Sequence, residues 1–447
     1  MADADGRARV KRVLLVACFA AFVTALDNSV LMVALPTIGR DLGLSTNDLQ
    51  WAVVSYMLVF ASLMPAAGAV GDRFGHRRVL LVGLLGFAAA SLGCGTSHGG
   101  WELALWRAAQ GAAAAAIVPT GLAVLRTELD AARRRTGIAA WTGALAMALA
   151  VGPALGGLLS EAAHWRWIFL GNVPACVAVA AFAFLALPSR RITRPTPLPI
   201  RSTAALTAAV FTVTATVLSV GGEGPVAALA ALSGAACLMF VAVERSAAHP
   251  LFPAGLARSG FVGGTVAQAL WGLAVSGVLF VLPLHLHHAE GLTPLATGLF
   301  FVPAALAVIA GAPVVPVLVS RLGPWRTAAC GLGAVTAGLV AMSFARPPVV
   351  LACLVVIGFG SALTTPLTTA VLDAADERVA GVASAAVTSS RELAGGLGVA
   401  VIGLAFTAAG LFAALVVAAG VVAVGLGIAI ALDPAARPRS ARSRHGA

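Results

Sequence analysis

Leu26-Asp27-Asn28-Ser29-Val30-Leu31-Met32-Val33-Ala34-Leu35-Pro36 closes the first long apolar segment of the chain, which covers residues 13–36. A segment of this length is long enough to cross a bilayer as an α-helix, which needs roughly 20 residues. One acid, Asp27, interrupts it. Because no small-residue cleavage site is evident, a retained transmembrane helix fits this stretch better than a secretory signal peptide does.

Further apolar segments follow this one and dominate the chain. Of 447 residues, 60% are hydrophobic and 11% are charged, whereas soluble domains carry roughly 25% charged residues. So few charges could not cover a soluble surface, and the composition therefore predicts an all-α polytopic membrane protein. The expected spans are 13–36, 48–70, 79–97, 101–125, 137–160, 168–188, 203–221, 225–243, 260–285, 294–319, 327–345, 347–371, 381–406 and 408–432.

The fourteen expected transmembrane helices fall into groups of six, two and six, and this grouping defines the expected domains. The predicted order is a cytoplasmic N-terminus at 1–12, an N-terminal six-helix bundle at 13–188, a cytoplasmic linker at 189–202, two additional transmembrane helices at 203–243, a cytoplasmic loop at 244–259, a C-terminal six-helix bundle at 260–432 and a basic cytoplasmic tail at 433–447.

The formal net charge of +11 raises the possibility of nucleic-acid binding, but the distribution of the charge argues against it. With both ends placed in the cytoplasm, 24 of the 29 basic residues fall on the cytoplasmic side, three on the other side and two within spans. Short basic loops of this kind follow the positive-inside rule. The pattern therefore predicts a multi-pass protein of the plasma membrane with both termini cytoplasmic.

Asp27 is the most informative residue for function. An ionised carboxylate in the hydrocarbon region is costly, so Asp27 is expected to face a bundle interior. A carboxyl group that binds and releases a proton near neutral pH could exchange protons with both sides, as a proton-coupled transporter requires. The alternative is a neutral Asp27 that is hydrogen-bonded to backbone as a packing element.

Arg107 is the second intramembrane charge, in the stretch Arg107-Ala108-Ala109-Gln110-Gly111. A guanidinium stays protonated, so Arg107 could bias a neighbouring carboxyl group but could not carry the proton itself. The alternative is an Arg107 that extends outward to the membrane interface, which Trp101 marks six residues earlier.

Glycines in two places predict special packing. In Gly152-Pro153-Ala154-Leu155-Gly156-Gly157 of the fifth span, the proline bends the helix and the glycines permit close contact with a neighbour. This predicts a pivot or a seal. The loop Gly68-Ala69-Val70-Gly71-Asp72-Arg73-Phe74-Gly75-His76-Arg77-Arg78 places a carboxylate among arginines, which could form a charge lock that opens as the bundles move. A positive-inside loop alone would explain Arg77 and Arg78, but not Asp72 and Gly75.

A weak internal repeat supports two related halves. The stretch Pro316–Arg326 ends the second span of the last six, as Gly68–Arg78 ends that of the first six, and three of eleven aligned positions are identical. Such duplication is typical of transporters with a binding site between two bundles. The identical pairs are Arg73/Arg321, Gly75/Gly323 and Arg78/Arg326.

Three other groups of residues receive less weight. The six cysteines all lie in apolar runs without paired spacing, which predicts packing rather than disulfides or a metal site. His285, His287 and His288 are interpreted as interfacial residues rather than metal ligands, because no carboxylate or thiol partners stand at ligand spacing. Arg391 and Glu392 lie about 100° apart on a helix, so they need not pair. Glu392 is a second candidate for proton coupling.

These motifs together resemble the major facilitator superfamily, and within it the 14-span drug:proton antiporter family. The family patterns are LDxTxVNVALP, GxxxDRxGxR, RxxQGxxxA, GPxxGG and WRWIFxINVP. They resemble, in that order, the stretches Leu26–Pro36, Gly68–Arg77, Arg107–Ala115, Gly152–Gly157 and Trp165–Pro174; the stretch Ser390–Ala400 also resembles the family.

The resemblance implies a major facilitator fold with two six-helix bundles and two linker helices. It implies a site for proton coupling and substrate, a gate loop and an antiporter motif. The site for proton coupling and substrate comprises Asp27, Arg107, Gln110 and Glu392, with Arg391 beside Glu392. The gate loop comprises Gly68, Asp72, Arg73, Gly75 and Arg77. The antiporter motif comprises Gly152, Pro153, Gly156 and Gly157.

Departures from the family pattern carry further expectations. Ser29 and Met32 replace the family's Thr and Asn, which predicts fewer polar contacts near Asp27. Ser320 replaces the Asp expected in the second-half loop, so any charge lock has one acidic member. The tenth span has no acid, so divalent organic cations are less expected as substrates than neutral, amphiphilic or monocationic compounds.

The expected function is proton-coupled antiport that exports hydrophobic or amphiphilic small molecules such as drugs and antibiotics. The expected partners are the small-molecule substrate, protons and the lipid bilayer, with no nucleic acid, no metal and no cofactor, in a monomer. A dedicated exporter of one endogenous metabolite is the alternative. A membrane enzyme or receptor is a remote one, because no HExxH, GxSxG or clustered acids occur and the longest polar stretch has about 15 residues.

Overall fold

The computed structural model describes residues 2–188, 198–220, 225–248, 250–252, 256, 259–345, 347–374 and 380–433. Within these residues every regular element is a helix. Residues 189–197 of the expected linker 189–202, residues 221–224 between the two additional helices, and the expected basic tail beyond residue 433 lie outside the described residues.

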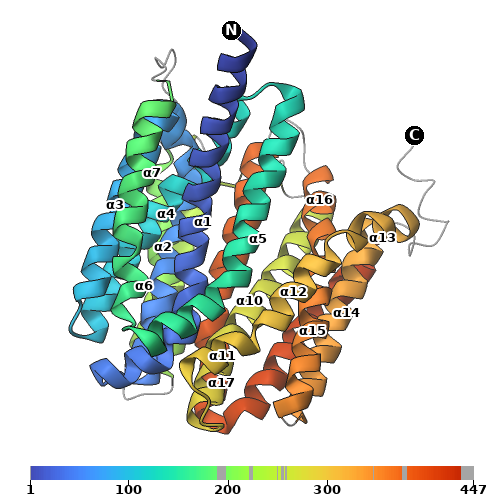
Figure 1. The fold of residues 1–447 in the computed structure, drawn as a ribbon. Coiled ribbons are helices and arrows are strands. Elements are labelled where there is room, and N and C mark those ends of the chain that lie inside the picture. Colours follow the sequence, from blue (N-terminus) through green and yellow to red (C-terminus); the bar gives the residue numbers. More distant parts are fainter. Residues whose placement is uncertain are drawn as a thin grey trace, which may run out of the picture. The chain divides into compact units, whose positions relative to one another are not determined.

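The chain divides into two compact units that interleave in sequence. Unit 1 contains residues 1–251 and 282–302, and unit 2 contains residues 252–281 and 303–447. The helices that lie within unit 1 (Figure 1) are α1 (Ala2–Leu42), α2 (Thr46–Phe74), α3 (His76–Thr96), α4 (Gly100–Glu128), α5 (Ala131–Ala162), α6 (Arg166–Leu170), α7 (Asn172–Ala186), α8 (Ile200–Ser219), α9 (Val226–Ser246) and α11 (Pro294–Phe300).

Unit 2 holds most of the remaining helices. Helix α10 (Ser259–His288) begins in unit 2 and enters unit 1 at Leu282. The others are α12 (Val302–Gly311), α13 (Val314–Leu322), α14 (Pro324–Ser343), α15 (Pro347–Leu363), α16 (Thr365–Asp373) and α17 (Ala380–Leu432). A buried apolar cluster inside unit 2 joins α10, α14, α16 and the start of α17 around Phe261, Ala328, Leu367 and Val387.

Twelve helices of the described residues are long and apolar enough to cross a membrane, whereas the sequence predicts fourteen spans. Two places account for the difference. The expected span 327–345 lies in α14, whose first turn carries Trp325 and Arg326 and which is not among the twelve. The expected spans 381–406 and 408–432 both lie in α17, in which two helical stretches meet at a kink with non-helical backbone at Ala409 and Gly410.

Helix ends follow local sequence signals. Ser45 and Asp48 form a capping box at the start of α2, where each side chain accepts a hydrogen bond from the other residue's backbone N–H. Asp130 caps α5 by accepting from Arg133 N at 2.9 Å. Gly75 joins α2 to α3 at φ 93°, and Gly323 joins α13 to α14 at φ 82°. The glycine shared by the two repeats therefore stands where only glycine is unstrained.

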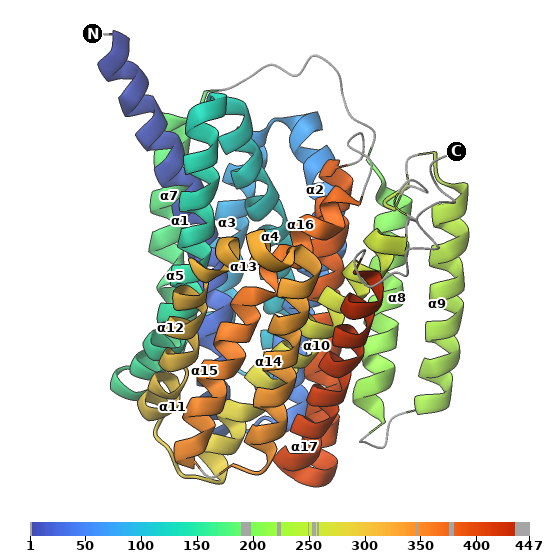
Figure 2. The same ribbon diagram turned by 90° about the vertical axis from the view of Figure 1, so that its right-hand side faces the viewer.

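Helices α8 and α9 form a side-by-side pair in unit 1 (Figure 2). Trp51 of α2 stacks on Phe211 of α8 with ring centroids 6.5 Å apart, which places α8 against α2. Thr216 and Ser233 share a hydrogen bond of 2.8 Å between α8 and α9. Across the described length of α9, Ser233 is the one buried residue, so this helix exposes nearly all of its apolar surface, as a lipid-facing helix does.

Candidate functional site

Asp27 lies inside unit 1 as the centre of a buried polar network. Its carboxylate accepts from Arg107 Nη1 at 2.5 Å, from Asn172 Nδ2 at 2.7 Å and from Gln110 Nε2 at 3.3 Å. Its exposed fraction is 1%, and those of Arg107 and Gln110 are zero. Helices α1, α4 and α7 therefore meet at one carboxylate that is sealed from solvent in this structure.

Arg107 is held on every side. Besides Asp27, its guanidinium donates to Ala52 O at 3.2 Å, to Gln110 Oε1 at 2.8 Å and to Asn28 Oδ1 at 3.3 Å. The ring of Tyr56 covers it, with the guanidinium carbon 4.3 Å from the ring centroid. Arg107 therefore does not extend outward to the membrane interface, unlike Trp101, which is 79% exposed.

The spacing of the RxxQG stretch explains this geometry. Arg107 and Gln110 lie three residues apart on α4, so both reach the same face of the helix and both contact Asp27. The next residue, Gly111, lies so close to the backbone of Tyr56 that a Cβ there would overlap its carbonyl oxygen. The glycine therefore lets α4 approach α2, which brings Arg107 within reach of Ala52 O and the Tyr56 ring.

Sequence reasoning missed four of the residues in this network. Asn172 belongs to the Trp165–Pro174 stretch, whose resemblance to the family assigns it no role. Ser91 and Cys94 of α3 contact the Gln110 amide at 2.8 and 3.3 Å. Tyr56 stands in none of the motifs. An asparagine two residues before a proline at a helix start is the one signal available for Asn172, whereas Ser91 and Cys94 look like ordinary packing residues.

The replacement of the family's Thr by Ser29 predicts fewer polar contacts near Asp27, but other residues provide the hydrogen bonds to its carboxylate. Ser29 Oγ donates to Leu26 O at 3.1 Å and to Ala148 O of α5 at 3.0 Å. It therefore ties α1 to α5, while Gln110 and Asn172 provide the neutral hydrogen bonds to the carboxylate.

The glycines of the Gly152–Gly157 stretch face two neighbours. A Cβ at Gly152 would overlap the Ser29 side chain, and one at Gly156 would overlap the backbone of Val30, so α5 packs directly on α1 one turn beyond Asp27. On its other side, Gly157 lies against the backbone of Pro294 in α11. Close contact is therefore confirmed, and the role of pivot or seal stays a prediction.

Pro153 and Glu161 complete the contact between α5 and α11. A Cβ at Gly298 of α11 would overlap the Pro153 carbonyl oxygen. Leu295 N donates to Glu161 Oε2 at 2.9 Å, so a carboxylate of α5 satisfies a backbone donor at the start of α11.

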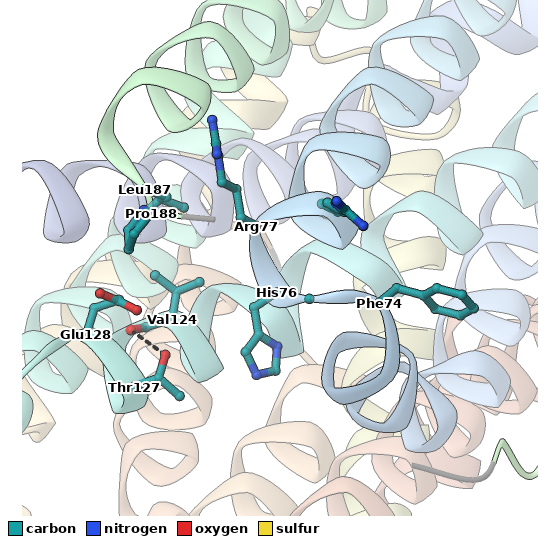
Figure 3. A pocket seen from close by; sticks show the side chains of 10 residues that line it. Phe74, His76, Arg77, Val124, Thr127, Glu128, Leu187 and Pro188 are labelled. Atoms are coloured by element: carbon teal, nitrogen blue, oxygen red, sulfur yellow. Dashed lines mark hydrogen bonds between the residues drawn. The ribbon is translucent and has the colours of Figure 1, made fainter. Parts of the chain in front are cut away.

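The expected gate loop forms the junction of α2 and α3 and borders a pocket (Figure 3). Asp72 pairs with His76 at 3.4 Å, while Arg73 lies over the Phe74 ring. Arg77 donates to the carbonyl of Phe184 in α7 and lies over its ring. The figure also shows Val124, Thr127 and Glu128 of α4 at the pocket wall. A Cβ at Gly68 would meet nothing within 4 Å. A charge lock between bundles stays a prediction.

Glu392 belongs to unit 2, whereas the Asp27 network belongs to unit 1. It pairs with its neighbour Arg391 at 2.6 Å, although adjacent helix positions point about 100° apart. The length and flexibility of both side chains explain this pairing. Gly272 of α10 lies against the backbone of Arg391, where a Cβ would come 2.9 Å from its carbonyl oxygen.

The three histidines at the end of α10 have local partners. His287 Nδ1 lies 2.8 Å from Leu292 O and His288 Nδ1 lies 2.9 Å from Leu284 O. His285 lies 3.7 Å from Glu290. Their partners therefore lie in α10 itself and in the connection that follows it, and the three rings do not share a partner.

The Asp27 network has one chemical property that a packing element does not need. Arg107 stays protonated and the amides carry no ionisable proton, so Asp27 is the carboxyl group of the network and the member whose charge a bound proton would cancel. A titratable carboxylate and a fixed cation, buried within helices of membrane-spanning length, are typical of a multi-pass membrane transporter.

Comparison with known proteins gives the family. The sequence pattern of the Major Facilitator Superfamily matches residues 17–399, and the chain belongs to this family. It is 36% identical to the cephamycin export protein CmcT of Amycolatopsis lactamdurans, over 89% of this chain and 85% of that protein. It is 32% identical to the multidrug efflux pump LfrA of Mycolicibacterium smegmatis, over 86% of this chain and 78% of the pump.

The fold agrees with this assignment. The crystal structure of the human organic anion transporter MFSD10 (TETRAN) superposes with a TM-score of 0.68 and 16% identity, covering 94% of this chain and 99% of that one. At this identity the likeness concerns the fold alone. The chain is thus a multi-pass membrane protein of a transporter family.

Proposed function

We propose that this chain is a proton-coupled antiporter that exports hydrophobic or amphiphilic small molecules across the plasma membrane. Its relatives are named as export, resistance and multidrug efflux proteins. The observation that carries the proposal is the buried Asp27–Arg107 pair, because a carboxylate sealed beside a fixed cation can couple proton binding to a change of structure.

The physical step is the neutralisation of Asp27. When ionised, Asp27 links α1 to α4 through Arg107 and to α7 through Asn172. When a proton binds, the carboxyl group becomes neutral while Arg107 keeps its charge, so the attraction between α1 and α4 falls. The proton gradient is adequate for transport, since one charge gains ~2.3 kcal/mol per 100 mV and ~1.4 kcal/mol per pH unit.

The proposal includes a topology of fourteen spans. To the twelve membrane-length helices it adds α14 and divides α17 at Ala409–Gly410, where the backbone is not helical. The positive-inside distribution then places both termini in the cytoplasm. In this proposal the protein acts as a monomer, catalyses no chemical reaction and holds no cofactor, and its energy comes from the proton gradient.

The Asp27→Asn variant tests the coupling. Asparagine keeps the size and polarity of the side chain but cannot take up a proton. In inverted vesicles with an imposed pH gradient, the wild type is expected to move ethidium in a manner that an uncoupler abolishes. Asp27→Asn is expected to lose most of this gradient-driven transport, roughly a tenfold change that corresponds to about 1.4 kcal/mol.

Retention of full proton-driven ethidium transport by Asp27→Asn would show that Asp27 is not the coupling group. Membrane insertion of both proteins at equal amounts serves as the control, together with Asp48→Asn. Asp48 is a surface acid that caps α2, so its loss leaves the network untouched.

A dedicated exporter of one endogenous compound is the second candidate, and the relatives include proteins named for single antibiotics as well as multidrug pumps. Resistance profiles separate the two functions. Protection of an expression strain against several chemically unrelated compounds supports the multidrug function, while protection against one supports the dedicated exporter.

A further inference from the structure

The carboxylate of Asp27 is surrounded by hydrogen-bond donors. Arg107 Nη1 approaches Oδ2, while Gln110 Nε2 and Asn172 Nδ2 approach Oδ1. All three are N–H groups, and an ionised carboxylate only accepts. The network therefore fits the ionised acid. A protonated Asp27 would carry an O–H that needs an acceptor in a site from which water is excluded.

Two of the three partners cannot supply that acceptor without breaking other bonds. Arginine has no acceptor atom. Gln110 Oε1 accepts from Arg107 at 2.8 Å and from Cys94 at 3.3 Å, while its Nε2 also donates to Ser91 at 2.8 Å. Rotation of the Gln110 amide would therefore break several contacts at once.

Asn172 is held differently. Within the described part of the chain, its side-chain amide makes the bond to Asp27 Oδ1 and is not fixed at a second point by another side chain. A half-turn about Cβ–Cγ exchanges Nδ2 and Oδ1. The amide would then present an acceptor to the same carboxyl oxygen, at the same separation.

The short helix that precedes Asn172 is anchored to two neighbouring helices. Trp165 Nε1 donates to Asp41 of α1 at 2.8 Å, and Arg166 donates to Ser97 O at the end of α3 at 2.7 Å. Trp165 is 1% exposed. These contacts fix the start of α6, the short helix directly before Asn172, against α1 and α3, so the segment that leads to Asn172 is held while its side-chain amide turns.

We propose that Asn172 is the positioning residue for the coupling proton: it donates to the ionised carboxylate of Asp27 and, after a half-turn, accepts the hydrogen of the protonated acid. The proton adds to Oδ1, the carboxyl group becomes neutral, and the charge of Arg107 is unchanged. This inference rests on the proposed proton coupling and adds the group that accommodates both protonation states.

The other titratable groups that face Asp27 come from three helices. They are Arg107 of α4, the thiol of Cys94 in α3 and the thiol of Cys176 in α7, and Tyr56 of α2 covers Arg107. Helix α5 meets this stretch of α1 through Gly152 and Gly156. The effect of Asn172 on proton binding is therefore expected to persist in a Cys176→Ala background.

Infrared titration of the purified protein tests the inference without a transported compound. The carbonyl band of a protonated carboxyl group that is missing in Asp27→Asn belongs to Asp27, and its intensity against pH gives the midpoint of proton binding. Asn172→Leu matches the size of asparagine but neither donates nor accepts. A hydrogen bond to an ionised group is about twice as strong as a neutral one, so its loss disfavours the ionised form more than the protonated form.

The midpoint in Asn172→Leu is therefore expected to move to higher pH by about half to one unit. Asn172→Ser, whose hydroxyl can both donate and accept, is expected to recover part of the shift, and it replaces Asn172→Leu if that variant does not fold. Gln268→Leu is the matched control, since Gln268 is a buried amide of unit 2 that pairs with Thr368 rather than with an acid.

An unchanged midpoint in folded Asn172→Leu would overturn the inference while leaving gradient-driven ethidium transport, and so the proposed function, intact. The opposite failure is also separable. If the wild type shows no Asp27 band from about pH 5 to 9, or if Asp27→Asn still couples, the coupling role of Asp27 fails and the role of Asn172 fails with it.

Discussion

The Asp27–Arg107 pair shows how a membrane protein keeps two charges away from water. Each ion alone would be costly in the hydrocarbon region. Together they are neutral, and the remaining hydrogen-bond capacity of both is used by Gln110, Asn172 and Ala52 O. Removal of one partner should therefore cost more than removal of both.

Arg107→Leu is expected to destabilise the folded protein by about 3–5 kcal/mol, since it leaves the carboxylate buried without a counter-charge. The double variant Asp27→Asn/Arg107→Leu is expected to be more stable than Arg107→Leu alone. Thermal unfolding midpoints in detergent for the two single variants and the double variant give the coupling between the sites.

The exposed pair Arg133–Asp130, 3.5 Å apart, is the control for this cycle. A surface ion pair contributes about 0–1 kcal/mol, so Arg133→Leu is expected to change the midpoint little. Additive effects of the Asp27 and Arg107 substitutions would contradict the view that the buried pair acts as one unit.

At the scale of the helix, the glycines of α5 determine how closely it packs on its neighbours. Gly152 and Gly156 face α1 immediately beyond Asp27, and Gly157 faces α11. The backbone of α5 thus stands against two neighbours at once, which side chains would prevent. Movement of α1 after protonation of Asp27 would therefore displace α5 directly.

Gly156→Ala is expected to destabilise the protein by about 1–3 kcal/mol and to reduce transport, because its methyl group overlaps the Val30 backbone, which cannot move aside as a side chain can. Gly143→Ala is the matched control on the same helix, since a Cβ there meets nothing within 4 Å. Its transport rate and unfolding midpoint should match those of the wild type. Equal behaviour of the two variants would show that α5 does not need a close approach to α1.

The whole molecule consists of two compact units and belongs to a family of transporters. The property to be measured at this scale is its membrane topology. With fourteen spans and the observed charge distribution, a reporter that is active in the cytoplasm should be active when fused after residue 447. The same reporter fused at residue 248, after α9, should also be active, because eight spans precede it.

A reporter fused after Thr96 at the end of α3 should be inactive, since three spans precede it. Activity at residue 248 together with inactivity at the C-terminus would mean that α17 crosses the membrane once, or that α14 does not cross. Either result would contradict the fourteen-span topology.

Composition and charge alone determined that this is an all-helical multi-pass membrane protein, because lipid permits few ways to satisfy a backbone and a long apolar run has one stable form there. The motifs by themselves placed Asp27, Arg107 and Gln110 in one site. Close packing at Gly152 and Gly156 was also predictable, since glycine spacing on a helix is a local property.

Only the tertiary structure decided which further groups complete the site around Asp27. Asn172 is 145 residues away in sequence and lies 2.7 Å from the carboxylate, and Ser91 and Cys94 orient Gln110 from a fourth helix, α3. Periodicity defines the face of one helix, but it does not say which face of another helix lies opposite. Which faces meet depends on side-chain packing between distant segments. Here small residues such as Gly111 determine the pairing, because they let two helices approach closely.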